Sequence, residues 1–112
     1  MATPYQRGSA FEHRVKAELE GEGWTVWRTP GSKSPCDLVA IKQSPILAPR
    51  ASMVRLVQCK LRGVISGAAR LELYALAHHL GAQPILAYTL RPGGAVHYQT
   101  WTASGIISQV ND

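Results

Sequence analysis

The fold of this chain can be inferred first from two apolar segments, PCDLVAIK at residues 35–42 and MVRLVQCKL at residues 53–61. Both are rich in Val, Leu and Ile, and such residues favour β-strands. We predict strands over residues 36–42 and 53–61, joined by a hairpin loop that contains Pro45 and Pro49. Because both faces of each strand are largely apolar, we expect the hairpin to be covered on two sides.

The segment ahead of this hairpin has the spacing of a helix. Phe11, Val15 and Leu19 recur at every fourth position, as they do on the buried side of an amphipathic helix. Ser9 and Glu12 fit a capping box, in which the two side chains bind free backbone amides at the helix start. We therefore predict a helix over residues 9–22, a strand over residues 24–29 and a Pro-, Gly- and Ser-rich loop up to residue 35.

A second helix and a second hairpin follow. Ser66 is a suitable N-cap and Gly81 a suitable residue just beyond the helix end. Between them, one helix face carries Leu73, Leu76, Ala77 and Leu80. Residues 84–90 and 95–101 flank a Pro-Gly-Gly turn at 92–94, which predicts a final hairpin.

These elements predict an α/β fold with a mixed central sheet of about five strands, flanked by two helices. Each helix is available to cover one face of the sheet. The length of 112 residues suits one domain over residues 1–112, with residues 102–112 as a C-terminal tail of undetermined structure.

The charge balance favours a polyanionic partner. Twelve Lys and Arg oppose seven Asp and Glu, so the net charge is +5 and the pI is near 9.6. Such an excess favours nucleic acid, because Lys and Arg release condensed counterions when they neutralise phosphates. An anionic membrane would attract the same charge, but no long basic amphipathic helix is present to bind it.

The cysteines and the hydropathy pattern indicate an intracellular protein. Cys36 and Cys59 are too few for a disulfide framework and do not have zinc-finger spacing. No signal peptide opens the chain, and no apolar run approaches the length of a membrane-spanning helix. We expect the cytoplasm of a prokaryotic cell, or of a phage-infected host, and no association with membranes.

Three polar residues interrupt the apolar hairpin. Alternation places Asp37 on one strand and Gln58 and Lys60 on the other, where all three can face the same side. Burying such groups is costly unless they pair or bind an ion. The Asp37 carboxylate, the Gln58 amide oxygen and the Cys59 backbone carbonyl would suit Mg²⁺, with Lys60 stabilising charge on phosphorus. A buried Asp37–Lys60 ion pair also explains the pattern, and strand chemistry alone slightly favours it.

A family resemblance changes this balance. Pro35-Cys36-Asp37, then twenty residues before Gln58-Cys59-Lys60, resembles the PD-(D/E)xK nuclease motif. RGSAFE at residues 7–12, followed by GWTVWRTPGS at residues 23–32, looks like the archaeal-type Holliday junction resolvases. The likeness implies a restriction-endonuclease-like core and a homodimeric, Mg²⁺-dependent endonuclease, in which Mn²⁺ substitutes for Mg²⁺. Such an enzyme resolves four-way DNA junctions by paired phosphodiester hydrolysis.

The resemblance also implies roles for individual residues. The catalytic set would comprise Glu12, Asp37, Gln58, Lys60 and Ser32. Metal ligands would come from Glu12, Asp37, Gln58 and the backbone carbonyl of Cys59. The DNA-binding residues would include Arg7, Arg28, Lys33 and Arg62. The second helix, with Leu73, Leu76 and Leu80, would contribute to the dimer interface.

The sequence departs from the motif at Gln58, where the usual residue is Glu. A neutral amide is a weaker Mg²⁺ ligand than a carboxylate and cannot act as a base, so the metal site loses one negative charge. Gln also occurs at this position in Mrr-like restriction enzymes. Two alternatives therefore stay open: a Mrr-like or other endonuclease acting on branched or duplex DNA, and a nucleic-acid-binding relative with little activity.

Overall fold

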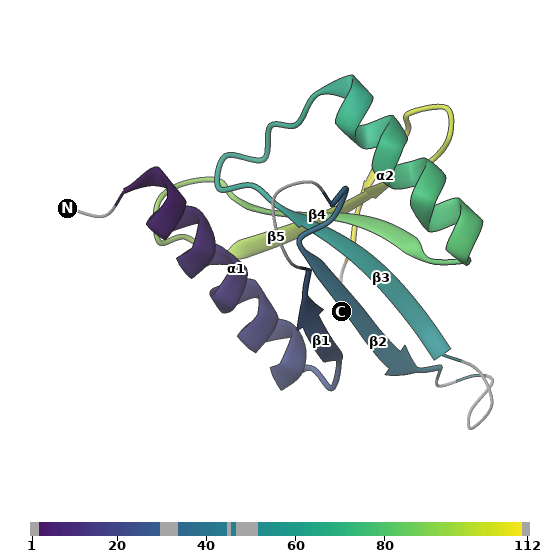
Figure 1. The fold of residues 1–112 in the computed structure, drawn as a ribbon, viewed down its shortest axis with the longest axis horizontal. Coiled ribbons are helices and arrows are strands. Elements are labelled where there is room, and N and C mark those ends of the chain that lie inside the picture. Colours follow the sequence, from purple (N-terminus) through teal and green to yellow (C-terminus); the bar gives the residue numbers. More distant parts are fainter. Residues whose placement is uncertain (1–2, 30–33, 45, 47–51, 111–112) are drawn as a thin grey trace.

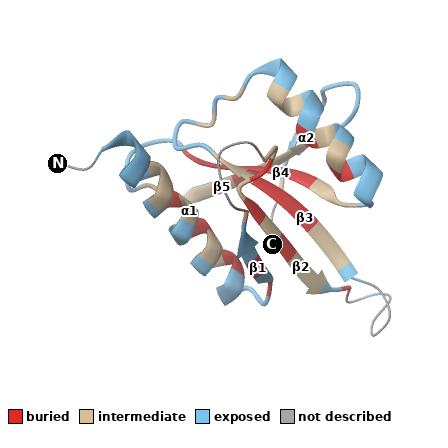
Figure 2. Cartoon of the chain, in the orientation of Figure 1, coloured by how far each residue is buried: buried red, intermediate tan, exposed pale blue. Residues whose placement is uncertain are grey.

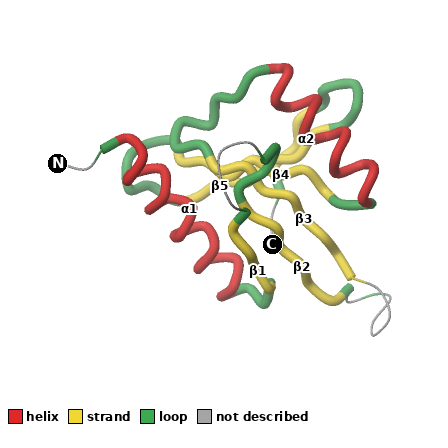
Figure 3. Tube along the Cα trace, viewed as in Figure 1, coloured by secondary structure: helices red, strands yellow, loops and turns green. Residues whose placement is uncertain are grey.

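The computed structural model describes residues 3–29, 34–44, 46 and 52–110. Within these ranges, six strands form a mixed sheet with the order β1-β2-β3-β4-β5-β6, and two helices pack against it (Figures 1 and 3). Neighbouring strands pair antiparallel except β3 and β4, which are parallel. The elements are α1 (Pro4–Gly21), β1 (Thr25–Arg28), β2 (Leu38–Gln43), β3 (Ser52–Cys59), α2 (Gly67–Leu80), β4 (Gln83–Thr89), β5 (Val96–Trp101) and β6 (Ile107–Gln109).

The predicted α/β architecture is confirmed, including one helix for each face of the sheet (Figure 1). On one face, Phe11, Val15 and Leu19 of α1 pack against Leu38 and Val57. On the other face, α2 buries its apolar side against a second cluster that contains Leu56, Leu73, Ala77 and Leu86. The sheet is therefore buried on both sides, and its buried residues concentrate in the central strands (Figure 2).

The start of α1 differs from the prediction. The helix begins at Pro4, and Thr3 is its N-cap, with its side chain accepting from the Gln6 amide while Gln6 returns to the Thr3 amide. The capping box predicted at Ser9 and Glu12 is therefore wrong. Proline is favoured in the first helical turn because its missing N–H would be unsatisfied there. Glu12 lies in the middle of the helix, so its carboxylate is free of any capping role.

The crossover from β3 to β4 runs through α2, as parallel neighbours require. Ser66 caps α2 by accepting from the Ala69 amide at 3.0 Å, and Gly81 ends it with φ 66°, as predicted. The side of α2 predicted to be apolar is only partly covered. Leu73 is 1% exposed, whereas Leu80 at the helix end is 56% exposed.

The C-terminal tail contains a strand that was not predicted. β6 pairs antiparallel with β5 through Gln99↔Gln109, Thr100↔Ser108 and Trp101↔Ile107. It forms one edge of the sheet, and all three of its residues are exposed. Over the described ranges, no helix has the length and apolar character needed to cross a membrane.

Candidate active site

Asp37 lies where the hydrogen-bonding ladder between β2 and β3 ends. Its backbone N–H donates to the Val57 carbonyl at 2.8 Å, and its carboxylate Oδ2 accepts from the Cys59 amide at 2.9 Å. The regular pairing of β2 with β3 ends at Leu38 and Val57, and Asp37 directly precedes it. The side chain thus takes the place of a backbone acceptor and is held by the strand it faces.

The surroundings of Asp37 disfavour its negative charge. Burial raises the pKa of this carboxyl above its usual range, and the nearby charge of Glu12 raises it further. The hydrogen bond from Cys59 and the positive charges of Lys60 and Arg28 act in the opposite direction without cancelling the rise. Asp37, Glu12, Lys60 and Arg28 therefore influence one another electrostatically, although they come from different parts of the chain.

Glu12 reaches this site from α1 and is held by Arg28. The Arg28 Nη2 atom lies 3.1 Å from Glu12 Oε1 and 3.3 Å from Ser9 Oγ, while Nη1 lies 3.2 Å from His13 Nε2. Arg28 ends β1, so this contact joins the edge strand to the helix. Sequence reasoning missed His13; its spacing from Ser9 shows only that the two residues share a face of α1, and its contact with Arg28 depends on how α1 packs on the sheet.

Gln58 and Lys60 line a cavity of about 340 Å³ at the carboxyl end of β3. Lys60 continues the pairing with β4, since its N–H donates to the Ala87 carbonyl at 3.0 Å. The chain turns directly afterwards, where the Gly63 N–H donates to the Lys60 carbonyl at 3.0 Å. Gly63 has φ 69°, and an added Cβ would lie 2.9 Å from the Tyr88 ring, so a side chain is excluded from this turn.

The predicted alternation of faces is wrong at the start of β2. Leu38 and Cys59 belong to the cluster beneath α1, while Cys36 packs with Leu56 and Leu86 beneath α2. Alternation fails because residues 36 and 37 precede the regular strand. Burial raises the pKa of both thiols, so neither cysteine is suited to act as a nucleophile.

The remaining predicted site residues are Ser32, Lys33, Arg7 and Arg62. Ser32 and Lys33 lie outside the described residues. Arg7 is exposed near the start of α1, and Arg62 is exposed in the turn after Lys60. The sequence did not single out Glu72, which lines the cavity beside Gln58 and Lys60 from α2.

The donor set fits a hard divalent cation that keeps part of its hydration shell. Asp37 has a second carboxylate oxygen besides the one bound to Cys59, and the Glu12 charge acts on it from α1. The N–H and C=O of one strand residue point to the same side, so the Cys59 carbonyl points toward the Asp37 side. No cluster of three or more His, Cys, Asp or Glu side chains gathers within the described part of the chain. Mg²⁺ can bind where so few acidic side chains are present, because it usually keeps several waters and takes only one or two carboxylates.

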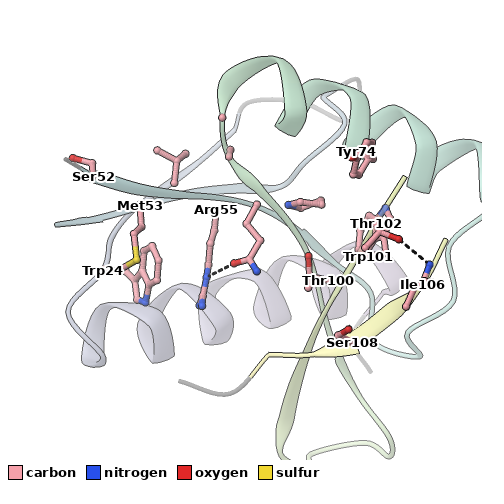
Figure 4. Close-up of a pocket in the computed structure, with 15 residues that line it drawn as sticks. Trp24, Ser52, Met53, Arg55, Tyr74, Thr100, Trp101, Thr102, Ile106 and Ser108 are labelled. Atoms are coloured by element: carbon pink, nitrogen blue, oxygen red, sulfur yellow. Dashed lines mark hydrogen bonds between the residues drawn. The ribbon is translucent and has the colours of Figure 1, made fainter. Parts of the chain in front are cut away.

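A larger cavity, of about 640 Å³, lies at the amino ends of β3 and β4, away from these residues (Figure 4). Arg55 stacks on the Trp24 ring there, 4.4 Å from its centroid, and donates from Nε to Gln83 at 3.3 Å. Trp101, Thr102 and Ile106 line another side of it. This cavity contains none of the predicted catalytic residues, so its size does not make it the catalytic site.

Comparisons with known proteins identify the family to which the chain belongs. No curated protein sequence matches the chain. The solved structure of Hjc, a Holliday junction resolvase from the archaeal hyperthermophile Archaeoglobus fulgidus, is similar to it, with a TM-score of 0.62 and 26% sequence identity. That similarity covers 82% of this chain and 70% of that chain. Residues 3–95 match the family described as archaeal Holliday junction resolvase (Hjc). Since this match spans most of the sequence, the chain belongs to the archaeal Holliday junction resolvase family, which is a family of nucleases.

Proposed function

We propose that this protein is a homodimeric, Mg²⁺-dependent endonuclease that resolves four-way DNA junctions by paired cuts, as a single nuclease domain. The observation that carries the proposal is the convergence on Asp37, where Glu12, Lys60 and Arg28 all act on one half-buried carboxyl. A carboxylate with a raised pKa beside a second acid is poorly stable alone and gains from a bound cation. Family membership supports the choice of DNA junctions as substrate.

The reaction is the addition of water to a backbone phosphorus, with cleavage of one P–O ester bond and protonation of the departing oxygen. Mg²⁺, when bound, supplies Lewis acidity and lowers the pKa of coordinated water. Asp37 would hold the cation, with Glu12 from α1 and the Gln58 amide oxygen and Cys59 carbonyl from β3 completing the protein's share. The Lys60 ammonium would stabilise negative charge that develops on the phosphate.

DNA would bind through its backbone. Arg7, Arg28 and Arg62, together with Lys33 and Ser32 in the loop before Asp37, are the residues we assign to phosphate contacts. Phosphate contacts fix position without reading sequence, which suits an enzyme that recognises junction shape. A homodimer would present two such sites related by two-fold symmetry, matching paired cuts on a symmetric junction. The cytoplasm, where prokaryotic and phage DNA recombine, is the expected place of action.

Cleavage of synthetic DNA tests this proposal directly. Purified protein is incubated with a four-way junction, a flap and a duplex of matched sequence, each with Mg²⁺, with Mn²⁺ and with chelator. We expect symmetric paired nicks in the junction only when metal is present. Asp37→Ala should abolish cleavage while junction binding stays measurable. Cleavage by that variant at the wild-type rate would refute the assignment of the site.

Gln58 favours a second candidate, because it lacks the charge of the usual Glu. A Mrr-like or other branched- or duplex-DNA endonuclease would cut the flap or the duplex as fast as the junction in the same assay. A nucleic-acid-binding relative with little activity would bind the junction and leave it uncut with either metal. The ratio of junction to duplex cleavage therefore separates these functions.

A further inference from the structure

Two turns lie side by side at the end of the sheet where Lys60 is found. The first turn, residues 61–64, follows Lys60 directly, and the second turn, residues 90–94, joins β4 to β5. Thr89 connects them, because its N–H and its hydroxyl donate to the Leu61 carbonyl at 3.3 Å and 2.9 Å. The first turn also lines the cavity that contains Lys60. Both turns therefore border the proposed catalytic centre.

The second turn has a defined shape and position. The Gly94 N–H donates to the Arg91 carbonyl at 3.0 Å, and Gly93 has φ 70°, a conformation that glycine adopts at no steric cost. The Arg14 side chain of α1 donates to the Gly94 carbonyl at 2.7 Å. The turn is thus tied to the first turn through Thr89 and to α1 through Arg14 (Figure 1).

The two turns expose apolar side chains among positive charges. Leu90 is 77% exposed, and Val64 is exposed in the first turn. Arg62 and Arg91 are exposed beside them, and neither arginine forms an ion pair within the described ranges. Neither turn contains Asp or Glu. The surface that they form is therefore suited to a polyanion that also has apolar surface to offer.

DNA has both kinds of surface, but it does not expose them equally everywhere. Arginine attracts the phosphate backbone of a duplex and of a junction alike. An exposed leucine alone needs no explanation, but it gains free energy when it is removed from water against an apolar surface. In DNA the base faces provide such a surface, and stacking covers them along a duplex. The branch point of a junction interrupts this stacking.

We infer that Leu90 packs against base faces at the branch point of the DNA, while Arg62 and Arg91 bind phosphates beside it. This inference rests on the proposed function, because it names the feature of the junction that the same enzyme recognises. Leu90 is then a specificity-determining residue and takes no part in the chemical step. It favours the junction because the same contact in a duplex would require base pairs to unstack, which costs free energy.

The test compares binding to a fluorescent four-way junction and to a duplex of matched sequence, measured by anisotropy in chelator. Leu90→Ser should weaken junction binding by about tenfold, as expected for loss of a buried leucine contact, and duplex binding by less than about twofold. Leu90→Met keeps an apolar side chain and should bind both DNAs as the wild type does. Ile46→Ser is the matched control, since Ile46 is 88% exposed between β2 and β3, at the other end of β3 from Lys60.

A fluorescent base analogue reports the contact itself. Aminopurine beside the branch point changes its fluorescence when its stacking changes, and aminopurine within a duplex arm serves as the control. At saturating protein, the wild type should change the branch-point signal and Leu90→Ser should not. Arg91→Ala should keep this change at saturation. It should weaken binding to junction and duplex alike and lower the slope of log affinity against log salt concentration by about one.

The outcomes separate this inference from the proposed function. If Leu90→Ser binds the junction and changes the aminopurine signal as the wild type does, the role of Leu90 is wrong, and junction cleavage still supports the nuclease. An equal loss of junction and duplex binding in Leu90→Ser, or the same loss in Ile46→Ser, would also overturn the inference, because neither marks the branch point. If the wild type neither prefers nor cuts the junction, the proposed function fails and the inference fails with it.

Discussion

Asp37 has a carboxyl whose charge the folded protein disfavours. Burial and the neighbouring Glu12 raise its pKa, so the native state holds this proton more tightly than the unfolded chain does. That difference stabilises the fold below the usual Asp pKa, and the advantage is lost as pH rises through the raised value. At neutral pH the metal-free protein therefore carries an unfavourable charge at Asp37.

Asp37→Asn should remove this cost, since an amide oxygen can still accept from the Cys59 N–H. We expect the variant, in chelator at pH 7.5, to melt at a higher temperature than the wild type. The difference should shrink as the pH falls toward about 4, the usual Asp range. Mg²⁺ should stabilise the wild type and leave the variant unchanged. Calorimetry across this pH range checks both effects, and a variant that is less stable at pH 7.5 would contradict them.

Arg28 is the residue we expect to exchange partners when DNA binds. Arg28→Ala should change the free energy of unfolding by about 1 kcal/mol or less, because its pair with Glu12 is partly exposed. Junction affinity should fall, and the slope of log affinity against log salt concentration should decrease by about one. Fluorescence anisotropy over a salt series measures this slope. Lys16→Ala, which removes a charge paired with Glu20 on α1, should leave it unchanged.

Single residues were predictable where chemistry stood out against an apolar background. Asp37 and Lys60 were identified because they interrupt strands, and a family resemblance added Glu12. The contact between His13 and Arg28 and the position of Glu72 could not be predicted in this way. Both depend on how a helix docks onto the sheet, and no local spacing encodes that arrangement.

At the level of elements, α1 shows how two similar signals compete. Thr3-Pro-Tyr-Gln6 and Ser9-Ala-Phe-Glu12 both fit a capping box. The first begins the helix because Pro4 is favourable in the first turn, and the added length outweighs the cost of Gly8 within the helix. The helix core was nevertheless predicted correctly from Phe11, Val15 and Leu19.

Removing each cap separately tests this assignment. Thr3→Ala should reduce the free energy of unfolding by about 1 kcal/mol, the usual effect of losing an N-cap. Ser9→Ala should have a smaller effect, because Ser9 lies within the helix and its hydroxyl has only a 3.3 Å contact with Arg28. Urea unfolding measures the free energy of unfolding of both variants. A larger decrease for Ser9→Ala than for Thr3→Ala would support a capping box at Ser9 and Glu12 instead.

β6 illustrates what the sequence does not reveal about short elements. It has three residues, all exposed, so no alternation of apolar and polar side chains marks it. Its formation depends on pairing with β5, and such a pairing is set by the turn before it and by the whole sheet. The long strands were predictable because burial on both faces makes them continuously apolar.

For the whole molecule, the order of elements predicted one helix on each face and a mixed sheet, and both are confirmed. The proposed dimer interface on α2 needs revision, because Leu73 is buried within its own subunit. Of the α2 leucines first assigned to the interface, only Leu80 is well exposed. It is thus the one best able to bury apolar surface against a second copy.

Leu80→Glu should therefore shift the proposed homodimer toward monomer, because a charge in an apolar contact is costly. Light scattering after size-exclusion chromatography measures the mass over a range of concentrations. Leu90→Glu provides a matched control, since Leu90 is 77% exposed at a turn. An equal response of both variants would exclude this part of α2 as the specific interface.

The hydrogen bonds of Thr29 have a consequence for how far the sequence before Asp37 can change. Its N–H donates to the Asp37 carbonyl at 2.9 Å and its hydroxyl to the Cys36 carbonyl at 2.7 Å. The segment between these residues is thus closed at its base, and lengthening a closed loop costs little entropy. Insertions or exchanges between Thr29 and Asp37 should therefore leave the Asp37 carboxylate in place, so the proposed phosphate contacts could change without rebuilding the proposed site. Exchanging this segment for that of a relative would show whether it contributes to the proposed DNA contacts.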